Sequence, residues 1–104
     1  MKEYKEIFKL KEMLEEANIP FEFEDNSGRS VHFRLYHIGY PVLPPVGCVC
    51  SVVEGNGTYG GKIDKLEIMG LLTEEEKEYD SVKGCLTAED VFGRIKKHYE
   101  EVEE

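Results

Sequence analysis

The chain has 104 residues, enough for one domain with a single modest core. It carries 22 Asp and Glu against 13 Lys and Arg, for a formal net charge of -9. Because binding to a nucleic-acid backbone needs clustered cations, this balance argues against direct binding to duplex nucleic acid. The chain shows no secretory apolar segment and no membrane-span-length apolar stretch, so we expect a cytoplasmic protein with no membrane contact.

The acidic residues gather in runs at positions 15–16, 74–76 and 100–104. Such runs are typical of solvated helix faces that keep a protein soluble. The alternative is a surface that imitates nucleic acid and blocks a basic protein.

The chain contains three cysteines, an odd number that fits a reducing compartment better than a disulfide scaffold. Cys48 and Cys50 lie two residues apart, so on a strand they would share a face as small buried hydrophobes. A metal site would recruit His32 or His37, but the paired C-x-x-C spacing of a zinc site is absent. We therefore expect neither a metal nor a cofactor.

The first half of the chain predicts a helix followed by a β-hairpin. Apolar residues recur at helical spacing over residues 2–18, and Pro20 ends this helix. Residues 21–24 alternate with period two, residues 25–28 have turn chemistry, and residues 30–36 alternate again. Residues 37–47 hold three prolines, which predicts a semi-rigid connection rather than a central strand.

The second half predicts one buried strand and more helix. Residues 48–53 form an uncharged, β-branched run, and residues 64–79 indicate one broken helix or two short ones. Residues 82–86 suggest a brief extended piece, and residues 87–102 an amphipathic closing helix. The expected fold is therefore a single α+β domain over residues 1–104. It has a three-stranded, mainly antiparallel sheet packed with an N-terminal helix, a short central helix and a C-terminal helix.

A glycine-rich turn joins the buried strand to the next element. Gly55, Gly57 and Gly60 spell G-x-G-x-x-G, but the second parallel strand that a dinucleotide fold needs is missing. A weaker interpretation survives, in which main-chain amides of this turn bind a phosphate. Its supporting residues are Tyr59, Gly60, Gly61 and Lys62. The alternative is an ordinary tight turn.

One face of the hairpin combines cations, imidazoles and aromatic rings. Such groups bind anionic, ring-containing ligands through bidentate contacts and stacking. The alternative is an ordinary solvent-exposed sheet face. The residues of this face are Arg29, His32, Arg34, Tyr36, His37 and Tyr40.

The sequence nominates no catalytic residue. No local signature pairs one of the cysteines with one of the histidines. Glu54 beside the glycine turn is a conceivable base, although a lone carboxylate without a partner is weak evidence. His98 belongs to the apolar stripe of the last helix and is expected to pack or cap rather than react.

Four segments carry a resemblance to a known group: LKEMLEEANIPFEF, CSVVEGNGTYGG, KIDKLEIMGLLTEEE and DSVKGCLTAEDVFGRIKKHYE. Together they resemble small uncharacterised proteins of phages and prophages of clostridia and related bacteria. The resemblance implies a viral accessory protein that counters host defence. One such class comprises oligomeric sponges that bind nucleotide immune signals, such as cyclic ADP-ribose derivatives, without cleaving them.

These observations together predict a homo-oligomeric small-ligand binding protein that sequesters a nucleotide immune signal without catalysis. The expected ligand-binding residues are Arg29, His32, Arg34, Tyr36, Tyr40, Tyr59, Gly60 and Gly61. One alternative is an inhibitor that acts on a host defence nuclease through its acidic surfaces. A second alternative is a small nucleotide hydrolase that uses Glu54 or a histidine.

Overall fold

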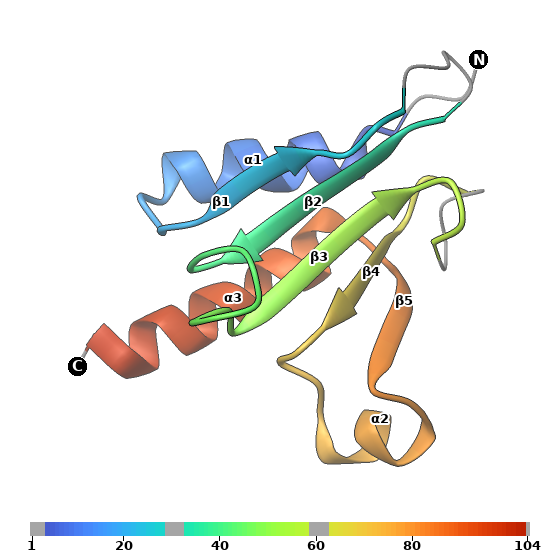
Figure 1. The fold of residues 1–104 in the computed structure, drawn as a ribbon. Helices are drawn as coiled ribbons and strands as arrows, with labels where there is room; N and C mark the ends of the chain where they lie inside the picture. The colour runs from blue at the N-terminus through green and yellow to red at the C-terminus, as the bar shows by residue number, and fades with distance from the viewer. Residues whose placement is uncertain (1–3, 29–32, 59–62, 104) are drawn as a thin grey trace.

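A computed structural model describes residues 4–28, 33–58 and 63–103. It is an α+β fold in which a five-stranded antiparallel sheet, in the order β1-β2-β3-β4-β5, carries two long helices on one face (Figure 1). The elements are α1 Glu6–Glu16, β1 Glu22–Asp25, β2 Leu35–Tyr40, β3 Cys50–Gly55, β4 Leu66–Met69, α2 Glu74–Tyr79, β5 Val82–Leu86 and α3 Ala88–Glu103. The expected class and the three expected helices are confirmed, but the sheet has five strands rather than three.

The hairpin forms, with its second strand further along the chain than predicted. β2 runs up to Tyr40 and pairs with both β1 and β3, so the segment before Pro41 is a central strand and not a connection. Pro41, Pro44 and Pro45 are compatible with this strand because all three come after its last residue. Tyr36, Ile38 and Tyr40 alternate onto the helix-covered face, which corrects the expectation that Tyr36 lies on an open face.

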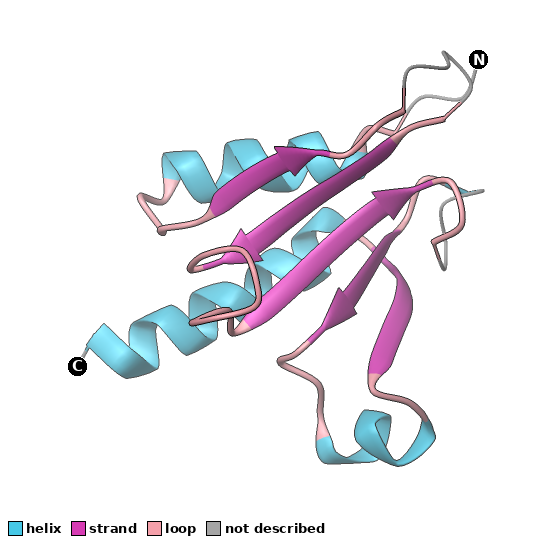
Figure 2. Ribbon diagram, in the orientation of Figure 1, coloured by secondary structure: helices cyan, strands magenta, loops and turns pink. Residues whose placement is uncertain are grey.

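The predicted helix over residues 64–79 is wrong in its first part. Leu66 and Ile68 are buried while Glu67 and Met69 are more exposed, which is the period-two pattern of a strand. The dense apolar residues hid this alternation. A turn with positive φ at Gly70 and Leu71 then ends the strand. Only residues 74–79 are helical, and Thr73 caps them, because its side-chain oxygen accepts from the Glu76 amide (Figure 2).

The core lies between the sheet and the two long helices. α1 and α3 contribute apolar stripes at helical spacing, and the inward positions of the central strands face them. The buried apolar members are Ile7, Leu10, Leu14, Ile19, Ile38, Tyr40, Cys50, Val52, Leu66, Ile68, Leu86, Ala88, Val91 and Ile95. The expected burial is confirmed for Cys50, but Cys48 lies before the start of β3 and is only partly buried.

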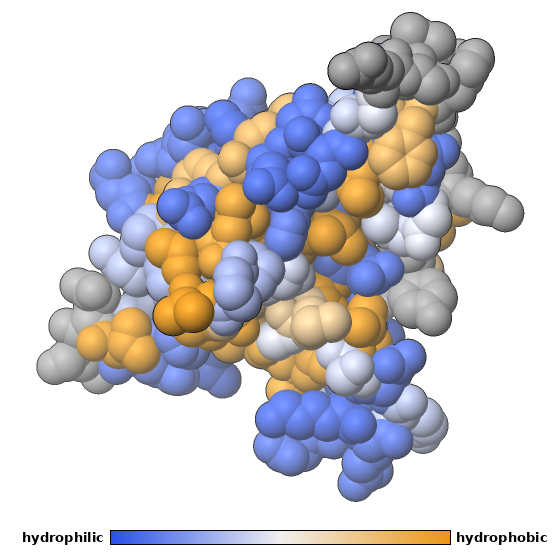
Figure 3. Space-filling view, in the orientation of Figure 1, coloured by the Kyte–Doolittle hydropathy of each residue, from blue (hydrophilic) through white to orange (hydrophobic). Residues whose placement is uncertain are grey.

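The other face of the sheet is not covered by either long helix and faces the viewer in Figures 1 and 3. Apolar side chains gather at its centre, whereas α2 is hydrophilic. The loop over residues 41–47 folds back across Gly39, where a Cβ would clash with the backbone of Leu43. The proline-containing loop therefore lies against the sheet at that point. Within the described ranges, no helix is long and apolar enough to cross a membrane.

Candidate functional site

Five of the predicted ligand-binding residues lie outside the described residues. They are Arg29, His32, Tyr59, Gly60 and Gly61. The described neighbours of the glycine turn are held by local bonds: the Thr58 hydroxyl donates to the Gly55 carbonyl oxygen (2.8 Å) and accepts from the Gly55 amide (3.1 Å). The Thr58 side chain therefore holds residues 55–58 in place.

The predicted aromatic ligand platform is wrong for both tyrosines of β2. Tyr40 is 2% exposed, so its ring cannot stack on a ligand base. Tyr36 packs edge-on against Phe8, with ring centroids 4.9 Å apart, and stacks on Phe23 at 6.3 Å. Alternation puts both rings against the helices, and the sequence interpretation misplaced them because it took the apolar residues at odd positions as the buried face, whereas the even positions of β2 face the core. Arg34 is half-buried, and its guanidinium donates to the Phe33 carbonyl oxygen (2.9 Å).

Glu54, considered above as a base, is fully buried on β3. Its Oε1 accepts from the Ile7 amide (3.0 Å) in the first turn of α1. Its Oε2 has no hydrogen-bond partner among the described residues. Burial, followed by the neighbouring Asp64 carboxylate, raises the pKa of Glu54 to about 9, so this carboxyl is protonated at neutral pH.

Asp64 completes this arrangement at the start of α1. Its Oδ1 accepts from the amides of Lys5 (2.8 Å) and Glu6 (3.2 Å). Burial alone would raise the pKa of Asp64, but these amides and the adjacent Glu54 carboxyl lower it. The two carboxyls thus satisfy amides that a helix N-terminus leaves unpaired. Glu54 has no exposed surface, and together with Asp64 it holds the start of α1 in place.

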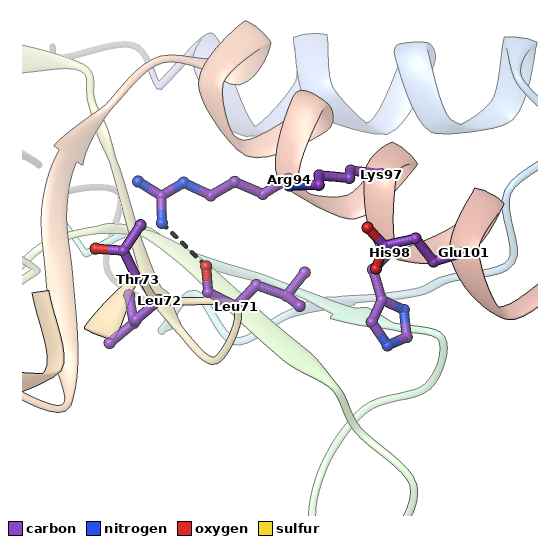
Figure 4. Close-up of a pocket in the computed structure, with 7 residues that line it drawn as sticks. All are labelled: Leu71, Leu72, Thr73, Arg94, Lys97, His98 and Glu101. Atoms are coloured by element: carbon purple, nitrogen blue, oxygen red, sulfur yellow. Dashed lines mark hydrogen bonds between the residues drawn. The ribbon is translucent and has the colours of Figure 1, made fainter. Parts of the chain in front are cut away.

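A pocket of about 490 Å³ lies between α3 and the segment that leads from β4 to α2. Leu71 and Leu72 form its apolar wall, and both pack against the core. The polar wall comes from one face of α3, at the helical spacing i, i+3, i+4 and i+7. Its members are Arg94, Lys97, His98 and Glu101, with Thr73 at the far end (Figure 4).

Arg94 is the best-positioned of these side chains. Its two terminal nitrogens bind the two carboxylate oxygens of Glu76, each at 2.8 Å, and Nη1 also donates to the Leu71 carbonyl oxygen at 3.0 Å. The guanidinium lowers the pKa of Glu76 to about 2, and Glu76 in turn raises the pKa of Arg94. Arg94 therefore links α3 to both the β4–α2 segment and α2 itself.

His98 is oriented by a contact with the core residue Tyr40. Its Nδ1 lies 2.8 Å from the buried Tyr40 hydroxyl, and the two rings meet edge-on with centroids 5.5 Å apart. Figure 4 shows the Leu71 side chain lying between the His98 ring and the Arg94 guanidinium. The predicted packing role of His98 is confirmed by this contact. Lys97, one residue earlier, is exposed at the pocket rim and is free to approach a ligand.

This pocket offers two cations, an imidazole and an apolar wall, with one acidic residue, Glu101. That set suits a small anionic molecule with an apolar or ring-bearing part. A second pocket, of about 300 Å³, is lined by Met13, Glu16, Ala17 and Phe92 and offers no cation. No group of three or more His, Cys, Asp or Glu in the described ranges is arranged to hold a metal ion.

Sequence reasoning missed Arg94 and Lys97. The signal was present, because residues 94, 97, 98 and 101 share one helix face, next to the apolar stripe. The sequence interpretation overlooked this helix face because Leu71 and Leu72, which form the opposite wall of the pocket, were assigned to a helix rather than to the turn that follows β4.

Comparison with known proteins adds no family to this description. No family model matches the chain, and neither a curated protein nor a solved structure shows significant similarity to it.

Proposed function

We propose that this protein binds and sequesters a small phosphate-bearing ligand, without catalysis, in the pocket between α3 and the β4–α2 segment. The observation that supports the proposal is the grouping of Arg94, Lys97 and His98 beside Leu71 and Leu72 in a pocket of about 490 Å³. This volume falls within the range of small-molecule sites, roughly 300–1,000 Å³. Arg94 is paired with Glu76 in this structure, so Lys97 at the rim is the cation that an incoming anion meets first.

The ligand class that we propose is a nucleotide immune signal, such as a cyclic ADP-ribose derivative. The phosphates of the ligand would contact Lys97 and Arg94, while its base or ribose would pack against Leu71 and Leu72. The sequence resemblance to phage proteins supports this choice, and the protein would then inhibit bacterial anti-phage defence in the host cytoplasm. The His98 imidazole, the group of this wall best suited to proton transfer near pH 7, is already paired with the Tyr40 hydroxyl, which favours binding without cleavage.

We also propose that the protein acts as a homo-oligomer that associates through the uncovered sheet face. At the centre of this face, His37 Nε2 lies 2.6 Å from Ser51 Oγ, Met69 is 56% exposed, and Glu24 and Glu67 lie at either end of the cross-strand row that contains His37. Burial lowers the pKa of His37, which keeps the ring neutral near pH 7. Analytical ultracentrifugation with Met69→Lys would test this, because a charge there should shift the oligomer toward monomer.

The binding proposal is tested by calorimetry with a panel of cyclic and linear nucleotides. We expect one class to bind, and Lys97→Ala to weaken that binding about tenfold, as loss of a charge-assisted contact would. Lys96→Ala is the matched control, because Lys96 is an exposed neighbour on α3 that does not line the pocket. The ligand should be recovered intact after heat denaturation of the complex.

Two results would overturn the proposal. If no nucleotide binds, or if both lysine variants bind equally well, the pocket is not the site. If the recovered nucleotide is cleaved, the protein is a hydrolase and the non-catalytic assignment is wrong.

A further inference from the structure

The Arg94 guanidinium has a carboxylate on its bidentate side in this structure. Both Glu76 oxygens lie 2.8 Å from its terminal nitrogens, the fork-to-fork geometry with which arginine also binds phosphate. The exposed fractions of the two side chains are 23% for Arg94 and 20% for Glu76, so the pair stays in contact with solvent. An incoming anion therefore has a route to it.

The helix that carries Glu76 is weakly attached. α2 is six residues long, has no buried residue, and projects away from the two long helices (Figure 1). Tyr79 at its end is 85% exposed. A helix this short owes its position to its contacts, because isolated helices of this length are unstable in water. Within the described residues, the bidentate pair with Arg94 ties α2 to α3.

We infer that Glu76 is an internal competitor for Arg94: its carboxylate occupies the site of a ligand phosphate, and ligand binding displaces it and releases α2 from α3. This inference rests on the proposed function, since it assigns the phosphate-binding residue of the same pocket. Arg94 would remain fixed by the Leu71 carbonyl oxygen, 3.0 Å from Nη1, when Glu76 leaves. The guanidinium is then held in place for a new bidentate partner.

The competition has a measurable consequence. When a site is open for only a fraction of the time, the apparent affinity falls by that fraction. Removing the charge of Glu76 should therefore tighten anion binding. Glu76→Gln is the suitable change, because the Glu76 side chain also accepts from the Thr73 amide (2.9 Å) and glutamine fills the same role in a capping box.

The experiment is calorimetric titration of the full chain with inorganic pyrophosphate. We expect Glu76→Gln to bind about tenfold more tightly than the wild type. Glu75→Gln is the matched control, since it removes the same charge from an exposed position in the same helix turn and should bind like the wild type. Adding Arg94→Ala to Glu76→Gln should abolish the gain.

A second measurement covers the case in which Glu76→Gln perturbs folding. Amide hydrogen exchange of the wild type should become faster in α2 at saturating pyrophosphate. Equal affinity for the two glutamine variants, a gain that survives Arg94→Ala, no pyrophosphate binding by any variant, or unchanged or slower α2 exchange overturns the inference. These results leave the nucleotide panel and the Lys97 comparison untouched, so failure here is distinguishable from failure of the proposed function.

Discussion

Replacing the buried Glu54 with glutamine should make the protein more stable at neutral and alkaline pH. The pKa of Glu54 is about 9 in the folded chain, against an ordinary value of 4.5. Folding at pH 7 must therefore take up a proton that the unfolded chain does not hold. Because the folded pKa is the higher one, the contribution of this group is full below pH 4.5 and is lost as the pH rises toward 9.

The magnitude follows from the size of that shift. Each pH unit between the two pKa values costs about 1.4 kcal/mol, so at pH 7 the wild type has lost about 3 kcal/mol relative to acid conditions. Glutamine keeps an oxygen to accept from the Ile7 amide and supplies a donor toward Asp64 without titrating. The advantage of Glu54→Gln should thus grow from near zero at pH 4.5 to about 3 kcal/mol at pH 7.

The assay is urea unfolding of both proteins, followed by circular dichroism, at several pH values between 5 and 8. Only the difference between the two curves is diagnostic, because carboxyls with lowered pKa, such as Glu76 and Asp90, give the wild type an opposite trend. Glu12→Gln on the exposed side of α1 is the control and should run parallel to the wild type. Parallel curves for Glu54→Gln as well would refute the assignment of a buried, protonated acid.

Two further predictions concern glycines and thiols. Gly70→Ala should destabilise the fold by about 2 kcal/mol or more in urea unfolding, since Gly70 has φ +100° and a Cβ there would clash with the Val49 carbonyl oxygen. Gly93→Ala should instead add about 0.5–1 kcal/mol, because nothing lies within 4 Å of the added methyl in α3; the reverse order of the two would contradict this backbone. A colorimetric thiol reagent should label exposed Cys85 first, Cys48 more slowly and Cys50 only on unfolding, because burial raises the pKa of the Cys50 thiol to about 12. Early labelling of Cys50 would show that the core opens near β3.

The parts of the fold that the sequence predicted are those in which one periodicity dominates. α1 and α3 have long apolar stripes, and residues 50–53 of β3 belong to an uncharged, β-branched run, so local pattern and tertiary burial agree there. β4 failed because its four residues are too few to separate period two from helical spacing when its neighbours at 63, 71 and 72 are also apolar. The bounds of β2 were predicted wrongly because they depend on its pairing with β1 and β3, which a local sequence pattern does not reveal.

The candidate site depended on those same two elements. Taking the apolar residues at odd positions as the buried face placed Tyr36 and Tyr40 on an open face, whereas the sheet directs both toward the helices. Treating Leu71 and Leu72 as helical hid the wall against which Arg94 and His98 stand. A pocket built by two segments distant in sequence becomes visible only when both are placed.

The structure also shows how part of the acidity of the chain is used. Glu54 and Asp64 accept from the first amides of α1, and Glu6 accepts from the Ala88 amide at the start of α3 (3.0 Å). Carboxylates are favoured at helix N-termini, where unpaired amides and the helix dipole attract negative charge.

Glu76 also acts within the fold: its carboxylate pairs with Arg94 and accepts from the Thr73 amide. These four carboxyls are therefore committed to holding the helices in place. A surface that imitates nucleic acid needs acidic side chains turned outward and unpaired, so it would have to draw on others, such as Glu75 and Glu78 on the exposed turns of α2. The helix that offers them is the one that we expect a ligand to release, so an acidic docking role for α2 and ligand binding at Arg94 would oppose each other through Glu76.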